Sequence, residues 1–193
     1  IVVVAIAAAA LAWWVSNSQK PSDSGLTGQL LFPDLAEQIN SVNHITLIGP
    51  GNRTLVTMNR ADEFWGVQER EGFRANLPQV KSLLAALAQT SIVENKTKRE
   101  QYFPRLGVEN VTSVDAAGFM VRLDDNDELS LIIGHPAPGG VGRYVRLYNG
   151  EQAYLVDEYL ELAPDPLQWI DNDVLTFDAD RVQEMYVRHG DGE

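Results

Sequence analysis

The sequence predicts an α+β protein in which an N-terminal transmembrane helix is followed by antiparallel β-hairpins packed with one long and one short helix. Three observations lead to this fold class. The first fifteen residues carry no charged side chain. Several short runs after them alternate apolar and polar residues between turn residues. One further stretch repeats its apolar residues with the helical period.

The predicted membrane anchor covers residues 1–15, from Ile1 to Val15. As a helix this segment extends about 22 Å at 1.5 Å per residue, whereas a bilayer core of about 30 Å needs about twenty residues. We therefore expect the N-terminal end of the helix to be missing. Trp13 and Trp14 lie where an interfacial aromatic belt is expected. A buried helix of a soluble domain and a cleaved signal peptide are the alternatives.

The composition changes abruptly after the anchor. Residues 16–29 are rich in Ser, Gly and other polar residues and are predicted to be a linker. Residues 30–175 are predicted to be an α+β domain outside the cytoplasm, because few Lys or Arg residues lie near the anchor and positive residues favour the cytoplasmic side. We expect a single-pass protein of the bacterial inner membrane, with this domain in the periplasm.

Strands are predicted where β-branched and aromatic residues alternate with polar ones between turns. The predicted strands are 42–48, 53–58, 64–67, 92–93, 119–123, 129–133, 143–148 and 152–156. Gly49-Pro50-Gly51-Asn52 is expected to form one hairpin turn and Asn149-Gly150 another, of type I′.

Two helices are predicted in the middle of the chain. The longer covers 77–89, with Asn76 as its N-cap, a proline in its first turn and five residues on one apolar stripe. The shorter covers 99–106 and is expected to end at Gly107, a residue suited to a left-handed C-terminal position.

A weak internal repeat is visible near the end of the sequence. The apolar spacing of 42, 45 and 47 recurs at 182, 185 and 187, and each copy is followed by a Gly-containing turn. We therefore expect residues 176–193 to be the start of a second repeat that is truncated at the end of the sequence.

The composition excludes several kinds of chemistry. The chain has no cysteine, so disulfides, thiolate metal sites, a Cys nucleophile and a lipid-modified N-terminal Cys are all excluded. It carries 27 Asp and Glu against 15 Lys and Arg, a net charge of −12. This charge argues against nucleic acid as a partner, because phosphate binding needs a basic surface.

No motif indicates a catalytic, metal or cofactor site. The three histidines, His44, His135 and His189, lack metal-binding spacing. Residues 124–128 resemble a calcium loop only in their acidity, lack the Gly and Glu of the EF-hand pattern, and are expected to form a hairpin turn. We predict no catalytic residues, no metal and no cofactor.

A glycine-rich loop, residues 134–142, is the best candidate for a partner contact. It has neither the Lys-Ser/Thr pair nor the following helix of a phosphate-binding loop. We expect Pro138, Gly139 and Gly140 to form an exposed hairpin tip, with Tyr144 and Tyr148 beside it as aromatic contacts. The alternatives are a mobile tip without a partner, and tyrosines used only for packing.

Several short motifs together resemble an uncharacterised bacterial family of single-pass membrane proteins, a domain of unknown function encoded beside gliding-motility-type ABC transporters. The resemblance spans roughly 39–175. Its motifs are Trp65, Pro78-Gln79-Val80-x-x-Leu83-Leu84-x-x-Leu87, Glu94-x-x-Thr97, Tyr102-x-x-x-Leu106-Gly107-Val108, Leu131-x-x-Gly134, Tyr144-Val145-Arg146 and Tyr154-Leu155-Val156.

The resemblance implies a non-enzymatic, extracytoplasmic accessory subunit of a membrane protein complex, with integral membrane subunits and the lipid bilayer as its partners. It implies no catalytic residues and identifies no substrate. Two alternatives stay open. One is a structural subunit of a respiratory or photosynthetic assembly. The other is an anchored hydrolase or carbohydrate-binding protein that uses the abundant acidic residues.

Overall fold

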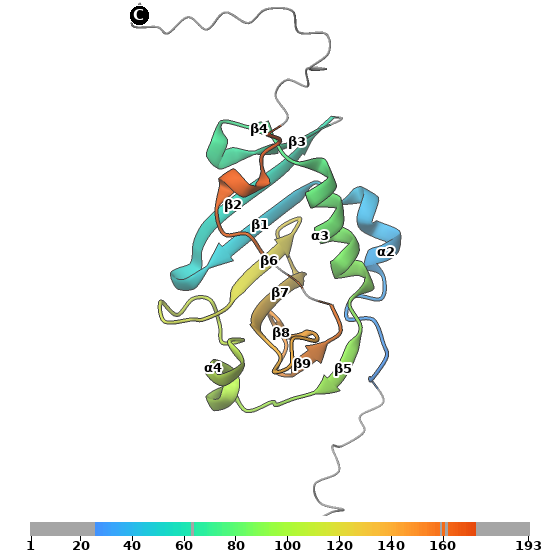
Figure 1. Ribbon diagram of the computed structural model, residues 1–193, viewed down its shortest axis with the longest axis vertical. Helices are drawn as coiled ribbons and strands as arrows, with labels where there is room; N and C mark the ends of the chain where they lie inside the picture. The colour runs from blue at the N-terminus through green and yellow to red at the C-terminus, as the bar shows by residue number, and fades with distance from the viewer. Residues whose placement is uncertain (1–25, 63, 159, 161, 173–193) are drawn as a thin grey trace, which may run out of the picture.

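A single antiparallel sheet dominates the structure (Figure 1). The computed structural model describes residues 26–172, except 63, 159 and 161. Within them, nine strands follow the order β4-β3-β2-β1-β6-β7-β8-β9-β5, and all neighbours are antiparallel. The strands are β1 (His44–Gly49), β2 (Arg53–Ala61), β3 (Phe64–Val67), β4 (Phe73–Arg74), β5 (Ile92–Asn95), β6 (Phe119–Leu123), β7 (Asn126–Pro136), β8 (Arg143–Leu147) and β9 (Ala153–Val156).

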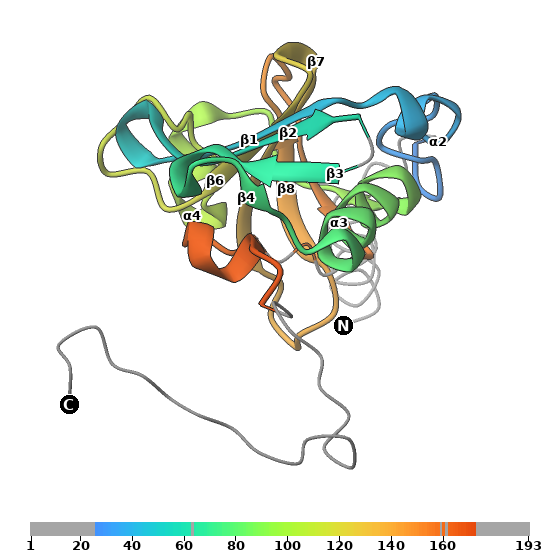
Figure 2. The ribbon, with the colours of Figure 1, turned by 90° about the horizontal axis from the view of Figure 1, so that it is seen from above.

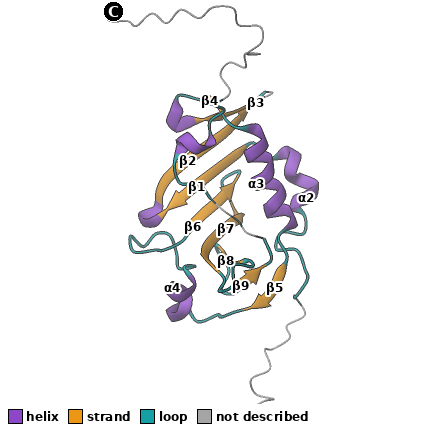
Figure 3. Cartoon of the chain, in the orientation of Figure 1, coloured by secondary structure: helices purple, strands orange, loops and turns teal. Residues whose placement is uncertain are grey.

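Helices are few and mostly short (Figure 3). Within the described residues, only α3 (Leu77–Gln89) is longer than one turn or so. The remaining α-helices are α2 (Leu35–Gln38) and α4 (Phe103–Leu106). Five 3₁₀ turns complete the set: η1 (Ile39–Ser41), η2 (Pro50–Asn52), η3 (Gln68–Arg70), η4 (Glu100–Tyr102) and η5 (Pro166–Trp169).

The predicted fold class, α+β hairpins packed with one long and one short helix, is wrong. The hairpins do not stay separate, because β1 pairs with β6 and joins two four-stranded meanders into one sheet. The predicted helix at 99–106 shrinks to η4 followed by the four residues of α4. What remains is a mostly antiparallel β-sheet protein with a few short helices.

The predicted transmembrane helix, 1–15, and the predicted second repeat, 176–193, lie outside the described residues. Among the described residues, no helix combines the length and the apolar character needed to cross a bilayer.

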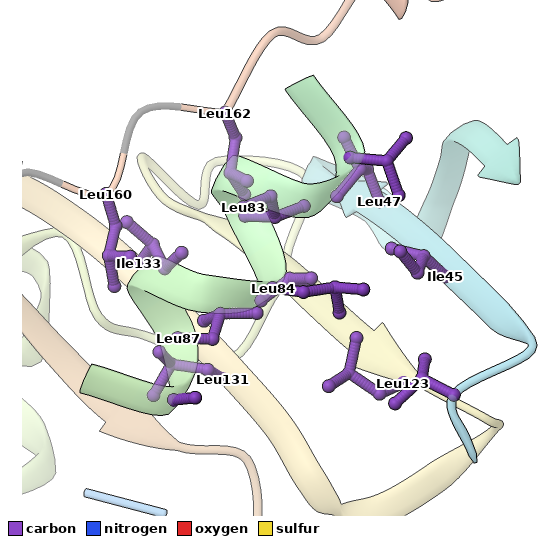
Figure 4. Packing of buried hydrophobic residues seen from close by; sticks show 14 of the residues in the cluster. Ile45, Leu47, Leu83, Leu84, Leu87, Leu123, Leu131, Ile133, Leu160 and Leu162 are labelled. Carbon is purple, nitrogen blue, oxygen red and sulfur yellow. The ribbon is translucent and has the colours of Figure 1, made fainter. Parts of the chain in front are cut away.

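The main hydrophobic core lies between α3 and one face of the sheet. Asn76 caps α3 by accepting a hydrogen bond from the Gln79 amide at 3.1 Å, as its position predicted. The buried stripe of the helix packs over the inward-facing residues of β1, β6 and β7 (Figure 4). Because the stripe and the strand residues are almost all Leu, Ile and Val, the contact excludes water and fixes α3 on this face.

A second, smaller hydrophobic cluster covers the opposite face of the sheet. Phe103 of α4, together with Val108 and Val111 after it, packs on Met120 of β6 and Ile132 of β7. Successive residues of β7 point to opposite faces of the sheet, so Leu131 and Ile133 belong to the main core while Ile132 belongs to the second cluster.

The two ends of the described chain cover the two edges of the sheet (Figure 1). Near the N-terminal end, the backbone of residues 28–31 exchanges hydrogen bonds with 90–92 at the outer edge of β5. Near the C-terminal end, residues 169–171 bond to 74–76 at the outer edge of β4. Covering of this kind protects exposed strand edges from pairing with other chains.

Candidate functional site

The predicted contact loop connects β7 to β8 and exposes its tip. Pro138, Gly139 and Gly140 are exposed, and the amide of Ala137 bonds to the carbonyl of Gly142, which closes the loop at its base. Val141 has 77 % of its surface exposed. The tip therefore presents an apolar side chain to solvent.

Tyr144 lies in β8 and Tyr148 just after its end. Both are on the same face of the strand, on either side of Arg146. Both are partly buried against the second cluster, and their rings lie near Lys96 at 5.7 Å and Arg122 at 5.3 Å respectively. Tyr148 is about 13 Å further along the strand than Tyr144 at 3.3 Å per residue. The structure thus brings Tyr144 next to the loop but not Tyr148.

Arg146 is a buried charged residue whose burial no pattern in the sequence indicates. It is only 6 % exposed and donates to the carbonyls of Val108 at 2.8 Å and Gly150 at 2.9 Å, and more weakly to that of Tyr148 at 3.1 Å. Its guanidinium lies 4.9 Å from the ring centre of Phe103. Burial lowers the pKa of Arg146 below its usual 12.5. Because its Nε and Nη1 donate to backbone oxygens, Arg146 ties the 108 and 150 loops to β8.

His44 is the centre of a polar network that links β1 to β2. Its Nδ1 bonds to Asn59 Oδ1, and the Thr46 hydroxyl lies 2.8 Å from its Nε2. An amide oxygen can only accept, so Nδ1 carries the proton and Thr46 donates to Nε2. Asp125 lies 3.6 Å from Nε2. Both ring nitrogens of His44 are thus hydrogen-bonded to side chains of β1 and β2. We therefore interpret His44 as a structural residue.

The described residues contain no group of three or more His, Asp or Glu side chains placed to hold a metal ion.

Two depressions lie side by side at the β3–β4 end of the sheet, around the first turns of α3. The first, about 320 Å³, has apolar lining from Trp65, Val80 and Leu84 and is bordered by Arg60 and Lys81. This volume is at the lower end of the range found for ligand sites in proteins.

The second depression, about 480 Å³, includes Phe64, Arg74 and Asp171. It shares Trp65 and Leu77 with the first, so the two depressions adjoin at these residues. We call the two adjoining depressions, with the residues named for both, the Trp65 groove.

The sequence indicates only part of the Trp65 groove. Its residues come from η1, β2, β3, β4, the start of α3 and the C-terminal strap at 171, so no local motif contains them. The one local hint is the pair Phe64-Trp65, two large aromatic residues on a four-residue strand. Alternation sends Trp65 inward at 6 % exposure and leaves Phe64 outside.

Large apolar side chains are exposed around the same end of the sheet. Phe64, Phe73, Leu77 and Leu167 each have between 37 % and 48 % of their surface exposed. They belong to neighbouring elements, because β3 pairs with β4, α3 follows β4, and η5 contacts η3 (Figure 2). Phe64 lies on the opposite face from Phe73, since Phe73 pairs with the core-facing Val67 and Phe64 precedes the core-facing Trp65. Exposed apolar residues around one end of a sheet are typical of interaction surfaces.

The model of a family described as "Domain of unknown function (DUF4340)" matches residues 65–193. The chain belongs to the DUF4340 family. A search of curated proteins and a search of solved structures each found no match. The DUF4340 match begins at Trp65 itself, within β3, and includes α3 and β5 to β9.

β1 and β2 precede the DUF4340 match, although they lie in the middle of the sheet. The β1–β6 pairing therefore joins a strand outside the match to one inside it. The Trp65 groove is divided in the same way, since Arg60 precedes the match and Lys81 lies within it.

Proposed function

We propose that this DUF4340 protein is a non-enzymatic, membrane-anchored accessory subunit of a membrane protein complex, with an ABC transporter as its partner. The observation that carries the proposal is the gathering of Phe64, Phe73, Leu77 and Leu167, all substantially exposed, at one end of the sheet. Such a surface gains free energy when a partner covers it.

The covered sheet edges support a partner that docks on side chains. Hydrogen bonds from 28–31 and 169–171 occupy backbone groups at the two outer strands. Strand addition, the commonest backbone-mediated way to bind an extended segment, is thereby obstructed where these bonds form. The exposed apolar surface and the tip at Val141 are then the docking features, with the former as the principal contact.

The placement at a membrane rests on the sequence. The charge-free residues 1–15 suit an anchor, and the scarcity of Lys and Arg just after them suits the side of the membrane away from the cytoplasm. We therefore propose the bacterial inner membrane, with the sheet domain in the periplasm. An anchor raises the local concentration of the domain near its partner, so a modest interface suffices.

Purification from native membranes tests this function. The full-length protein carrying a small affinity tag would be extracted in a mild detergent and separated on a native gel, and its co-migrating proteins identified by mass spectrometry. We expect integral membrane subunits and the ATPase of a transporter. Migration alone would contradict the accessory role, and co-migration with respiratory or photosynthetic subunits would contradict the transporter assignment.

A further inference from the structure

The Trp65 groove has the form of a path for an extended chain. Its two depressions, about 320 and 480 Å³, meet at Trp65 and Leu77 instead of forming one enclosed cage. A compact small molecule would fill one depression only. An extended polypeptide, at about 3.3 Å per residue, would contact both with side chains a few residues apart.

Cations outnumber carboxylates at the groove, where three basic residues stand against one acidic residue, Asp171, whereas acidic residues outnumber basic ones in the chain as a whole. Arg60 and Lys81 border the first depression and Arg74 the second, in a protein of net charge −12. Arg60 donates to the carbonyl of Asn40 at 2.7 Å, and Arg74 lies 5.8 Å from the ring centre of Phe64. Within the part of the chain that the structure describes, none of the three cations has a carboxylate within ion-pair distance.

The apolar lining between these cations sets a second requirement for whatever binds in the groove. Val80 and Leu84 are buried in the wall of α3, whereas Leu77 is 37 % exposed at its first turn. Leu77 lies where the two depressions meet, beside Trp65. A large apolar side chain placed there would cover Leu77, with cations on both sides of it.

We propose that the Trp65 groove binds an extended acidic segment of the partner protein. A large apolar side chain of that segment lies against Trp65 and Leu77. A carboxylate on one side of it faces Lys81 and Arg60, and a carboxylate on the other side faces Arg74. The inference rests on the proposed accessory function, since it names the chemistry of the partner segment. Charge complementarity selects this occupant, because the groove carries three cations against one carboxylate, Asp171, and a basic segment would add to this excess of positive charge.

Synthetic peptides give a direct test. The full 193-residue chain in a neutral detergent would be titrated with an Asp- and Glu-rich peptide of about ten residues, which spans about 33 Å when extended, with one central Phe. We expect an amide version, with Asn and Gln in place of the acids, to bind at least about tenfold more weakly. A version with Ala for Phe is expected to lose about tenfold as well.

Variants of the protein locate the binding. Lys81→Glu and Leu77→Ala are each expected to weaken the acidic peptide about five- to tenfold. Lys98→Glu is the matched control, because Lys98 is exposed after β5, outside the groove, and its variant carries the same net charge as Lys81→Glu. Thermal unfolding of every variant would show that each stays folded.

Three results would overturn the inference. The first is equal binding of the acidic and amide peptides, and the second is equal weakening of peptide binding by Lys81→Glu and Lys98→Glu. The third is a protein that does not bind the peptide but binds anionic vesicles and loses this vesicle binding in Lys81→Glu. Failure of the accessory function is distinguishable. A protein that migrates alone from membranes yet binds the acidic peptide at Lys81 would contradict the function and keep the groove chemistry. If the Lys81→Glu variant instead retained its partner in full, the groove chemistry would be contradicted and the accessory function would be kept.

Discussion

A Cβ atom on Gly134 would lie 2.2 Å from the carbonyl oxygen of Leu106. The end of α4 therefore rests directly on the backbone of β7, with no room for a side chain between them. Gly107, with φ of 68°, turns the chain in the left-handed region at this point. Two of the motifs behind the family resemblance, at 106–108 and 131–134, thus meet in space, and their glycines have a steric explanation.

Gly134→Ala is expected to lower the free energy of unfolding by about 2–3 kcal/mol, because the added methyl must displace backbone. Urea unfolding measures the change. Gly150→Ala is the control, since its Cβ would meet the Leu147 Cβ at 3.1 Å and no backbone closer than 3.3 Å. We expect the control to cost less than about 1 kcal/mol. Equal losses in both variants would contradict the close contact of α4 with β7.

Arg146→Lys is expected to destabilise the protein by about 2–4 kcal/mol, although the charge is retained. An ammonium group cannot reproduce the planar set of donors in which Nε reaches the Val108 carbonyl and Nη1 the Gly150 carbonyl, so buried carbonyls lose their partners. Arg105→Lys is the control, because Arg105 is exposed and its guanidinium lies 5.1 Å from the ring centre of Tyr102. A loss for Arg146→Lys no larger than for Arg105→Lys would show that Arg146 does not tie the loops together.

Tyr154 predicts a specific sensitivity to alkaline pH. Burial raises the pKa of its phenol above the usual 10.0, so the unfolded chain releases this proton before the folded one does. The stability that depends on neutral Tyr154 is complete below about pH 10 and is lost as the pH rises through the folded-state pKa. Unfolding free energies of the wild type and Tyr154→Phe should differ by a constant amount below about pH 10. Above it the wild type should decline more steeply, and parallel curves would contradict the prediction.

Val141→Asp tests the contact of the β7–β8 loop. The side chain is exposed, so we expect unchanged thermal stability and a reduced yield of partner in purifications from membranes, because a charge would enter an apolar contact. Val114→Asp is the matched control, since Val114 is exposed to a similar degree on another loop. An equal yield of partner with Val141→Asp and the wild type would exclude the loop tip from the interface.

Local features of the sequence predicted local features of the structure well. The apolar stripe and Asn76 predicted α3 and its cap, and Gly107 predicted the end of α4. These signals act within a few residues, where propensity and capping decide the backbone. By contrast, Asn149-Gly150 was expected as a type I′ turn, and neither residue has the positive φ that such a turn requires.

Long-range pairing was beyond local patterns, and the fold class failed for that reason. β1 could have paired with several strands, and nothing in residues 44–49 selects β6, more than seventy positions away. The same limit hid the Trp65 groove, which six separate segments of the chain assemble. Arg146 was missed differently, because its position in an alternating strand suggested solvent, whereas the 99–116 segment covers that face of the sheet.

Parallel purification of the wild type, Lys81→Glu and Lys98→Glu from native membranes tests the central claim most directly, that this protein is an accessory subunit docked through the Trp65 groove. We predict that transporter subunits co-migrate with the wild type and with Lys98→Glu, and that Lys81→Glu retains about a fifth of them or less. Migration of the wild type alone, or equal amounts of partner with all three proteins, would contradict it.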